Sequence, residues 1–70
     1  MPKKIRELKK MLLVAGFELE PKRGKGSHTL WKHPLYEGSI TLSGKDNKDA
    51  QPYQEKDVKL AIKKVKENEA

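Results

Sequence analysis

The feature that most constrains the fold of this chain of 70 residues is a pair of hydrophobic stripes with helical spacing, one near each end. Three short segments of alternating apolar and polar residues lie between them. The first stripe has the spacing of one buried helix face and consists of Ile5, Leu8, Leu12 and Ala15. The second stripe has similar spacing near the C-terminus and consists of Val58, Ala61, Ile62 and Val65. Between them, apolar and polar residues alternate as they do in half-buried strands. The pattern predicts helix, strand, strand, strand and helix, over residues 3–15, 17–22, 27–33, 39–43 and about 53–67.

This order predicts an α+β fold, α-β-β-β-α, over a single domain of residues 1–70. A three-stranded antiparallel sheet with two helices packed on one face would bury every apolar stripe and leave the other face of the sheet open. Glycine and proline mark the boundaries. Gly16 is expected to end the first helix, and the predicted connections are turns at residues 21–26 and 35–38 and a polar loop at residues 44–52.

Several classes of protein are disfavoured by what the sequence lacks. It contains no cysteine, so disulfides and cysteine-based zinc sites are excluded. Its longest apolar run, Met11–Ala15, is too short to span a membrane, and the N-terminus has no signal-peptide stretch, so we expect a cytoplasmic protein without a membrane partner. Asp46, Asn47 and Asp49 lack the spacing of a calcium-binding EF-hand, which favours a solvated loop. We expect no metal and no cofactor.

The charge distribution points to a polyanionic partner. The net charge is +6, and the first 36 residues carry all of this excess, because bases and acids balance over residues 37–70. Such a basic half suits nucleic acid, since phosphate contacts supply most nonspecific affinity. The alternative explanation of the positive charge is that it keeps a small domain soluble. The lysines of the first helix are expected to form a solvated face, some of them free to contact phosphate or an acidic protein surface.

The alternation of the strand at residues 27–33 separates two sets of side chains. The even residues, His28, Leu30 and Lys32, are expected on the open face. Trp31 is the largest apolar group, so its face is expected to pack on the helices, with base stacking as the alternative. Unless a bulge intervenes, His33 shares the parity of Trp31, and it is expected to be structural, which disfavours a mechanism that uses both histidines.

His28 is the candidate catalytic residue. An imidazole transfers protons near neutral pH, and cleavage of RNA by its own 2′-hydroxyl needs such a base or acid. The predicted RNA contacts comprise cations, close backbone approach at glycine and one hydroxyl donor: Lys22, Arg23, Gly24, Lys25, Gly26, Ser27 and Lys32. The competing interpretations are a plain RNA contact and a structural histidine, the latter being the commoner role of a lone histidine in a strand.

Residues 26–34, Gly-Ser-His-Thr-Leu-Trp-Lys-His-Pro, resemble the Gly-Ser-His segment of the HicA toxin family, small ribonucleases of bacteria and archaea. The resemblance extends to Gly16-Phe17, to Ile40-Thr41-Leu42 and to residues 52–58. It implies a double-stranded-RNA-binding-like fold, metal-independent cleavage of mRNA with the catalytic histidine at His28, and neutralisation by a HicB antitoxin. The loop at residues 44–51 departs from the family's shortest members, being longer and more polar.

Two functions of different classes are therefore compared. The first is an endoribonuclease toxin of a type II toxin-antitoxin system, a monomer when free, with mRNA and a HicB-type antitoxin as partners. The second is a non-catalytic RNA-binding module of the same fold. A domain that binds only proteins is a weaker third possibility.

Overall fold

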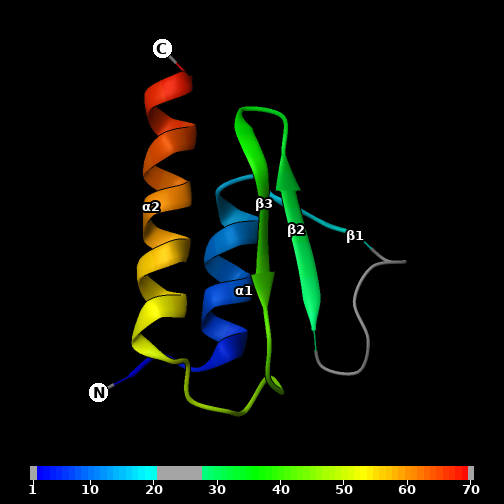
Figure 1. Cartoon of the computed structure of the whole chain (residues 1–70), viewed down its shortest axis with the longest axis vertical. Helices are drawn as coiled ribbons and strands as arrows, with labels where there is room; N and C mark the ends of the chain where they lie inside the picture. The colour runs from blue at the N-terminus through cyan, green and yellow to red at the C-terminus, as the bar shows by residue number, and fades with distance from the viewer. Residues whose placement is uncertain (1, 21–27, 70) are drawn as a thin grey trace.

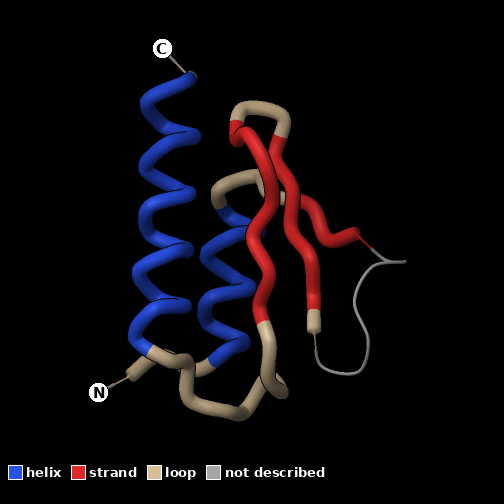
Figure 2. Tube along the Cα trace, in the orientation of Figure 1, coloured by secondary structure: helices blue, strands red, loops and turns tan. Residues whose placement is uncertain are grey.

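The computed structural model describes residues 2–20 and 28–69. Within these residues the elements follow the predicted order, namely α1 (Ile5–Val14), β1 (Glu18–Glu20), β2 (Thr29–His33), β3 (Tyr36–Leu42) and α2 (Pro52–Asn68). The strands form one antiparallel sheet in the order β1-β2-β3. Figure 1 shows both helices on one side of this sheet, and Figure 2 shows the same two layers by element type. The predicted α+β fold is confirmed.

The core lies between the sheet and the two helices. Alternation along the strands sets its boundary, because Trp31 and Ile40 are buried whereas Lys32 and Thr41 are exposed. The core side chains are Ile5, Leu8, Leu12, Phe17, Trp31, Ile40, Leu42, Ala50, Val58, Ala61 and Val65. Both predicted helix stripes are thus largely confirmed, although Ala15 and Ile62 are only partly buried.

Gly16 ends α1 as predicted. Its φ of 97° is in the left-handed region that glycine adopts without a Cβ penalty. The Gly16 N–H donates to the Leu13 carbonyl at 3.0 Å, and the Phe17 N–H donates to the Leu12 carbonyl at 2.9 Å. This pair of bonds is a Schellman motif, which satisfies carbonyls at the helix end and turns the chain into β1.

The third strand begins earlier than the alternation predicts. Residues 35–38 were expected to form a turn, yet β3 starts at Tyr36, and Pro34 and Leu35 make the connection from β2. Tyr36 pairs with His33 and packs on Phe17, with ring centroids 5.7 Å apart. The strand register shifts between Trp31 and His33, and Gly38 has a φ of 92°. Gly38 lies within this irregular strand. Because glycine is typical of turns, the sequence resembles a turn although the chain forms a strand there.

The polar loop after β3 is exposed over residues 45–49, as expected of a solvated loop, but it also holds the start of α1. The Ile5 N–H donates to the Lys48 carbonyl at 2.8 Å, and the Arg6 N–H donates to the Asp46 carbonyl at 3.1 Å. These are N-terminal helix donors that have no partner within the helix. The loop therefore acts as the cap of α1.

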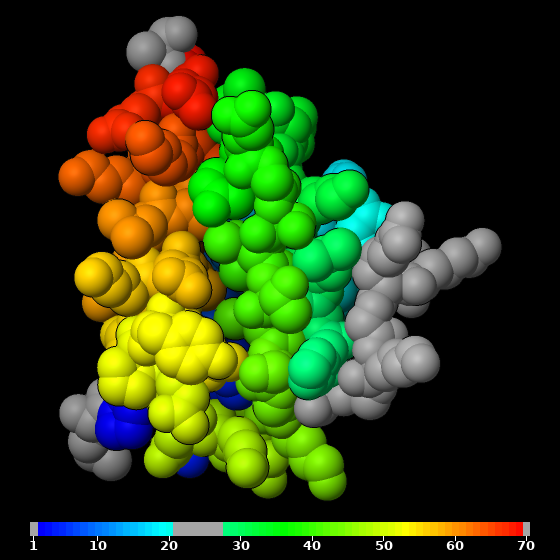
Figure 3. Space-filling model, in the orientation of Figure 1, coloured from blue at the N-terminus to red at the C-terminus, as the bar shows by residue number. Residues whose placement is uncertain are grey.

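Gln54 joins the end of β3 to the start of α2 and is a buried polar side chain, 3% exposed. Its Nε2 donates to the Ser43 carbonyl at 3.0 Å, and its Oε1 accepts from the Gln51 N–H at 2.8 Å. The space-filling view in Figure 3 shows β3 lying alongside α2 on this side of the molecule. The sequence pattern gave no sign that a glutamine would occupy this core position.

Candidate functional site

His28 lies immediately before β2, and its side chain is exposed. The segment that precedes it falls outside the described residues, so the predicted RNA contacts at Lys22, Arg23, Gly24, Lys25, Gly26 and Ser27 remain predictions. The even-numbered residues of β2 lie on the face of the sheet that the helices do not cover, since Trp31 is on the buried face. Continued alternation would bring His28 to that open face.

The residue that follows His28 is fixed on both its backbone and its side chain. Thr29 pairs with Leu42 of β3, and its Oγ1 accepts a hydrogen bond from the Trp31 Nε1 at 2.9 Å. The same hydroxyl donates to the Leu42 carbonyl at 3.4 Å. Trp31 itself is 2% exposed, which confirms its predicted place in the core. His28 thus directly precedes a residue that is hydrogen-bonded to both β2 and β3.

Lys32 is exposed on β2, and its Cα partner across the sheet is Glu18 of β1. Directly opposed residues in antiparallel strands have their side chains on the same face. Glu20 lies opposite Leu30 in the same way, and Leu30 is half-buried. The open face near β1 is therefore of mixed charge, and the cationic character predicted for the site depends on Lys32 together with the segment before His28.

His33 is held by its own surroundings. The Leu35 N–H donates to its Nδ1 at 2.9 Å, which requires the neutral tautomer with the proton on Nε2. Its ring packs against Phe17 with centroids 5.1 Å apart, and a Cβ placed on Gly16 would come within 3.0 Å of its Nε2. These contacts support the predicted structural role, and one of them is to the core residue Phe17.

Part of the helix α1 surface differs from the predicted solvated face. Lys4 forms an ion pair with Asp49 at 2.7 Å, and Lys9 forms one with Asp46 at 2.6 Å. Both acids belong to the loop that caps the helix. These two lysines are thus partly neutralised, and the two loop acids considered for calcium have cationic partners. Among the residues that the structure describes, no three His, Asp or Glu side chains gather as a metal site would require.

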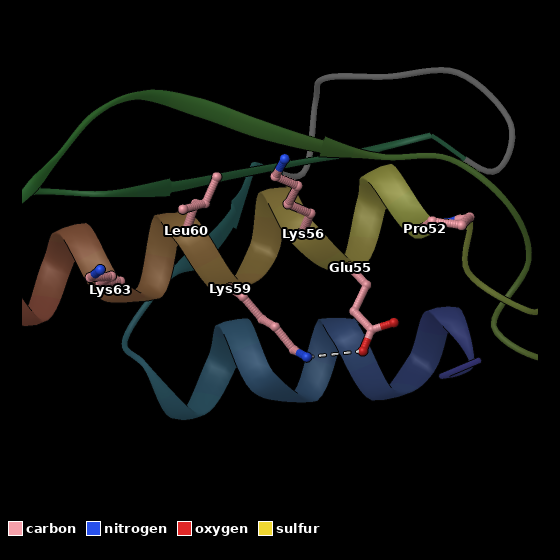
Figure 4. Close-up of a pocket in the computed structure, with 6 residues that line it drawn as sticks. All are labelled: Pro52, Glu55, Lys56, Lys59, Leu60 and Lys63. Carbon is pink, nitrogen blue, oxygen red and sulfur yellow. Dashed lines mark ion pairs between the residues drawn. The ribbon is translucent and has the colours of Figure 1, made fainter. Parts of the chain in front are cut away.

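A shallow hollow along α2 was not anticipated from the sequence. Its lining is rich in lysine and consists of Pro52, Glu55, Lys56, Lys59, Leu60 and Lys63. Figure 4 shows Lys56 and Leu60 pointing to one side of the helix, and Glu55 and Lys59 pointing to the other. Glu55 and Lys59 form an ion pair at 3.2 Å, which is common at this helical spacing. None of these residues is a predicted site residue.

The comparisons with known proteins identify one family. The family model described as the HicA toxin of bacterial toxin-antitoxin systems matches residues 5–66. Neither a search of curated proteins nor a search of solved structures yields a significant match. In the part of the chain that the structure describes, no helix has the length and hydrophobicity needed to cross a bilayer. Because the matched region covers nearly the whole chain, the chain belongs to the HicA toxin family of toxin-antitoxin systems.

Proposed function

We propose that this chain is the toxin of a type II toxin-antitoxin system and that it is a metal-independent endoribonuclease that cleaves mRNA with His28. The observation that carries the proposal is the contrast between the two histidines. His28 is an exposed imidazole that follows a basic segment in the sequence, whereas His33 is engaged by the Leu35 N–H and by the Phe17 ring.

The proposed chemistry uses the 2′-hydroxyl of the RNA as the nucleophile. The 2′-oxygen attacks the adjacent phosphorus, a 2′,3′-cyclic phosphate forms, and the bond to the 5′-oxygen of the next nucleotide breaks. One proton leaves the 2′-hydroxyl and one reaches the departing 5′-oxygen. His28 carries one of these transfers, which contributes about 10²–10⁴-fold to the rate. The other transfer falls to a different group, because the His33 Nδ1 already accepts the Leu35 N–H and the His33 ring packs on the buried Phe17.

The remaining site residues stabilise charge on the phosphate. Lys22, Arg23, Lys25 and Lys32 supply cations, and Ser27 supplies a hydroxyl donor. Gly24 and Gly26 permit close approach of the backbone to the phosphate. The hydrogen bond between Trp31 and Thr29 supports this arrangement, because it fixes the residue next to His28 and so limits the positions that the imidazole can take.

The partners follow from the same proposal. The substrate is mRNA, and a HicB-type antitoxin binds the toxin and holds it inactive. The free toxin is a monomer of a single domain, residues 1–70, that acts in the cytoplasm and requires no cofactor. Family membership supports the antitoxin in general terms, since a toxin of this kind has a protein partner.

The test compares single-stranded RNA with DNA of the same sequence, each incubated with the protein in EDTA. We expect cleavage of the RNA alone, with a cyclic phosphate at the new 3′ end. Cleavage of the DNA would contradict the 2′-hydroxyl mechanism. Binding of the RNA without any cleavage would favour the non-catalytic RNA-binding module instead, and failure to bind RNA at low salt would favour a domain that binds only proteins.

A further inference from the structure

A groove between α1 and α2 has the features of a surface that binds a protein partner. Its volume is about 550 Å³, and its apolar lining comes from Met11 and Val14 of α1, from Ala15 directly after that helix, and from Ile62 of α2. Val14 is 80% exposed although it is a large aliphatic residue. An exposed apolar patch with a polar rim is typical of a protein interaction site.

The groove residues lie along α1 beside the stripe that packs in the core, and Met11 and Ala15 contact both. Glu7, Lys10 and Val14 recur at helical spacing along one side, while Leu8 and Leu12 are fully buried. On α2, Ile62 borders the groove next to the buried Ala61. Met11, Ala15 and Ile62 thus pack against the edge of the core, and the exposed Val14 extends their apolar surface outward between the helices.

The rim of this groove is positively charged. Lys3, Lys10 and Lys66 line it, and none of them takes part in the ion pairs that the structure describes within residues 2–20 and 28–69. Glu7 is the acidic lining residue, and its Oε2 already accepts the Lys4 N–H at 2.7 Å as part of the helix cap. An occupant with carboxylates on both sides of an apolar stripe would match this surface.

We propose that this groove binds a short acidic amphipathic helix of a partner protein. An amphipathic helix laid in a groove uses apolar side chains at positions i, i+3 or i+4, and i+7. The groove extends from Lys3, which precedes α1, along the helix to Val14, and α1 is about 14 Å long, which accommodates a partner helix of between two and three turns. The proposal specifies a surface for the protein partner included in the proposed function and rests on the existence of that partner.

Other occupants fit less well. The lining contains no aromatic residue on which bases could stack, which disfavours single-stranded RNA. A second copy of this chain would bring another net charge of +6 to a positive rim. A membrane surface would require a broad apolar face, and this one is confined to the seam between two helices.

Occupation of the groove leaves the open face of the sheet accessible. The helices cover one face of the sheet, and the groove lies in the helix layer, whereas Lys32 is exposed on the uncovered face. A partner helix in the groove would therefore anchor a protein to the toxin without itself covering the residues predicted to bind RNA. Binding at the groove and cleavage of RNA can accordingly be measured as separate properties.

The experiment titrates the full chain with a fluorescent peptide designed as a helix of about 12 residues, with one leucine stripe flanked by glutamates. We expect saturable binding, weakened at least tenfold by Val14→Glu and by Lys10→Glu, and unchanged by Leu60→Glu. Leu60 is the matched control, because it is 50% exposed on α2 and lies outside the groove. Circular dichroism establishes that each variant is folded.

Two further peptides and one further assay complete the test. A peptide with lysine in place of glutamate, and one with the same composition in scrambled order, are both expected not to bind. The proposal is overturned if the scrambled peptide binds equally well, if Val14→Glu binds like the parent, or if the parent fails to bind at millimolar peptide. RNA cleavage by Val14→Glu is expected to equal that of the parent, so a failure of the groove proposal is distinct from a failure of the ribonuclease proposal.

Discussion

The Trp31 indole N–H donates to the Thr29 hydroxyl at 2.9 Å, one residue from His28. Trp31 is in the core, so this bond connects the packing of the sheet to the start of β2. The Thr29 hydroxyl in turn donates to the Leu42 carbonyl on β3. His28, the candidate catalytic residue, is therefore adjacent in the sequence to a threonine whose position depends on the packing of the buried Trp31.

Replacing Thr29 tests this connection. Thr29→Val keeps the shape of the side chain but leaves the Trp31 N–H without its acceptor, which we expect to lower the free energy of unfolding by about 1–3 kcal/mol. Denaturant unfolding followed by Trp31 fluorescence measures the loss. Thr29→Ser retains the hydroxyl and is expected to unfold close to the parent. Equal stability of the valine and serine variants would show that the hydrogen bond is unimportant.

If His33 is structural, replacing it is expected to lower the stability of the protein without changing the rate of RNA cleavage. His33→Ala removes the acceptor of the Leu35 N–H and the ring that packs on Phe17, so we expect a loss of about 1–2 kcal/mol in unfolding free energy. Single-turnover cleavage by the folded fraction is expected to be unchanged. A loss of cleavage in a well-folded His33→Ala protein would instead give His33 a part in the chemistry.

Lys32 and Glu18 are cross-strand neighbours of opposite charge, so removing the charge of each is expected to change RNA affinity in opposite directions. If Lys32 contacts a phosphate, Lys32→Gln weakens binding and makes the negative slope of log affinity against log salt less steep by about one. Glu18→Gln removes a neighbouring negative charge and strengthens binding. Lys63→Gln makes the same charge change on α2 and is the control. Equal effects of Lys32→Gln and Lys63→Gln would mean that only net charge matters and that RNA does not lie on this face.

The buried Gln54, which lies outside the candidate site, is expected to contribute to the free energy of unfolding. Gln54→Ala removes the hydrogen bonds to the Ser43 carbonyl and from the Gln51 N–H, and we expect it to cost about 1–3 kcal/mol. The exposed Lys56→Ala is the control and is expected to change stability by less than about 0.5 kcal/mol. Thermal unfolding of the two variants beside the parent makes the comparison, and equal midpoints would contradict the role assigned to Gln54.

The predictable part of the fold is the part with local periodicity. The helix stripe at Leu8 and Leu12 and the alternation that buries Trp31 both follow from backbone geometry, which repeats along the sequence. The start of β3 at Tyr36 was missed because Gly38 resembles a turn residue, while the contact that fixes the strand, Tyr36 on Phe17, joins distant positions.

The contacts of the polar loop were missed for a similar reason. Lys9 and Asp46 are 37 residues apart, and no local pattern indicates that they pair. Charge counting along the sequence therefore treated Lys4 and Lys9 as part of a solvated face. For the candidate site, the motif around His28 predicts the catalytic residue, and strand parity predicts a different, structural role for His33. The groove between the helices depends on how two distant stripes meet, which the sequence does not specify.

The most direct test of the central claim is the rate of RNA cleavage by His28→Ala in EDTA, measured beside the parent protein. His28 is exposed, so the variant is expected to fold normally and to retain RNA affinity. We predict a loss of cleavage of about 10²-fold or more, the scale of a missing proton-transfer group. Cleavage by a folded, RNA-binding His28→Ala protein at the parental rate would contradict the account.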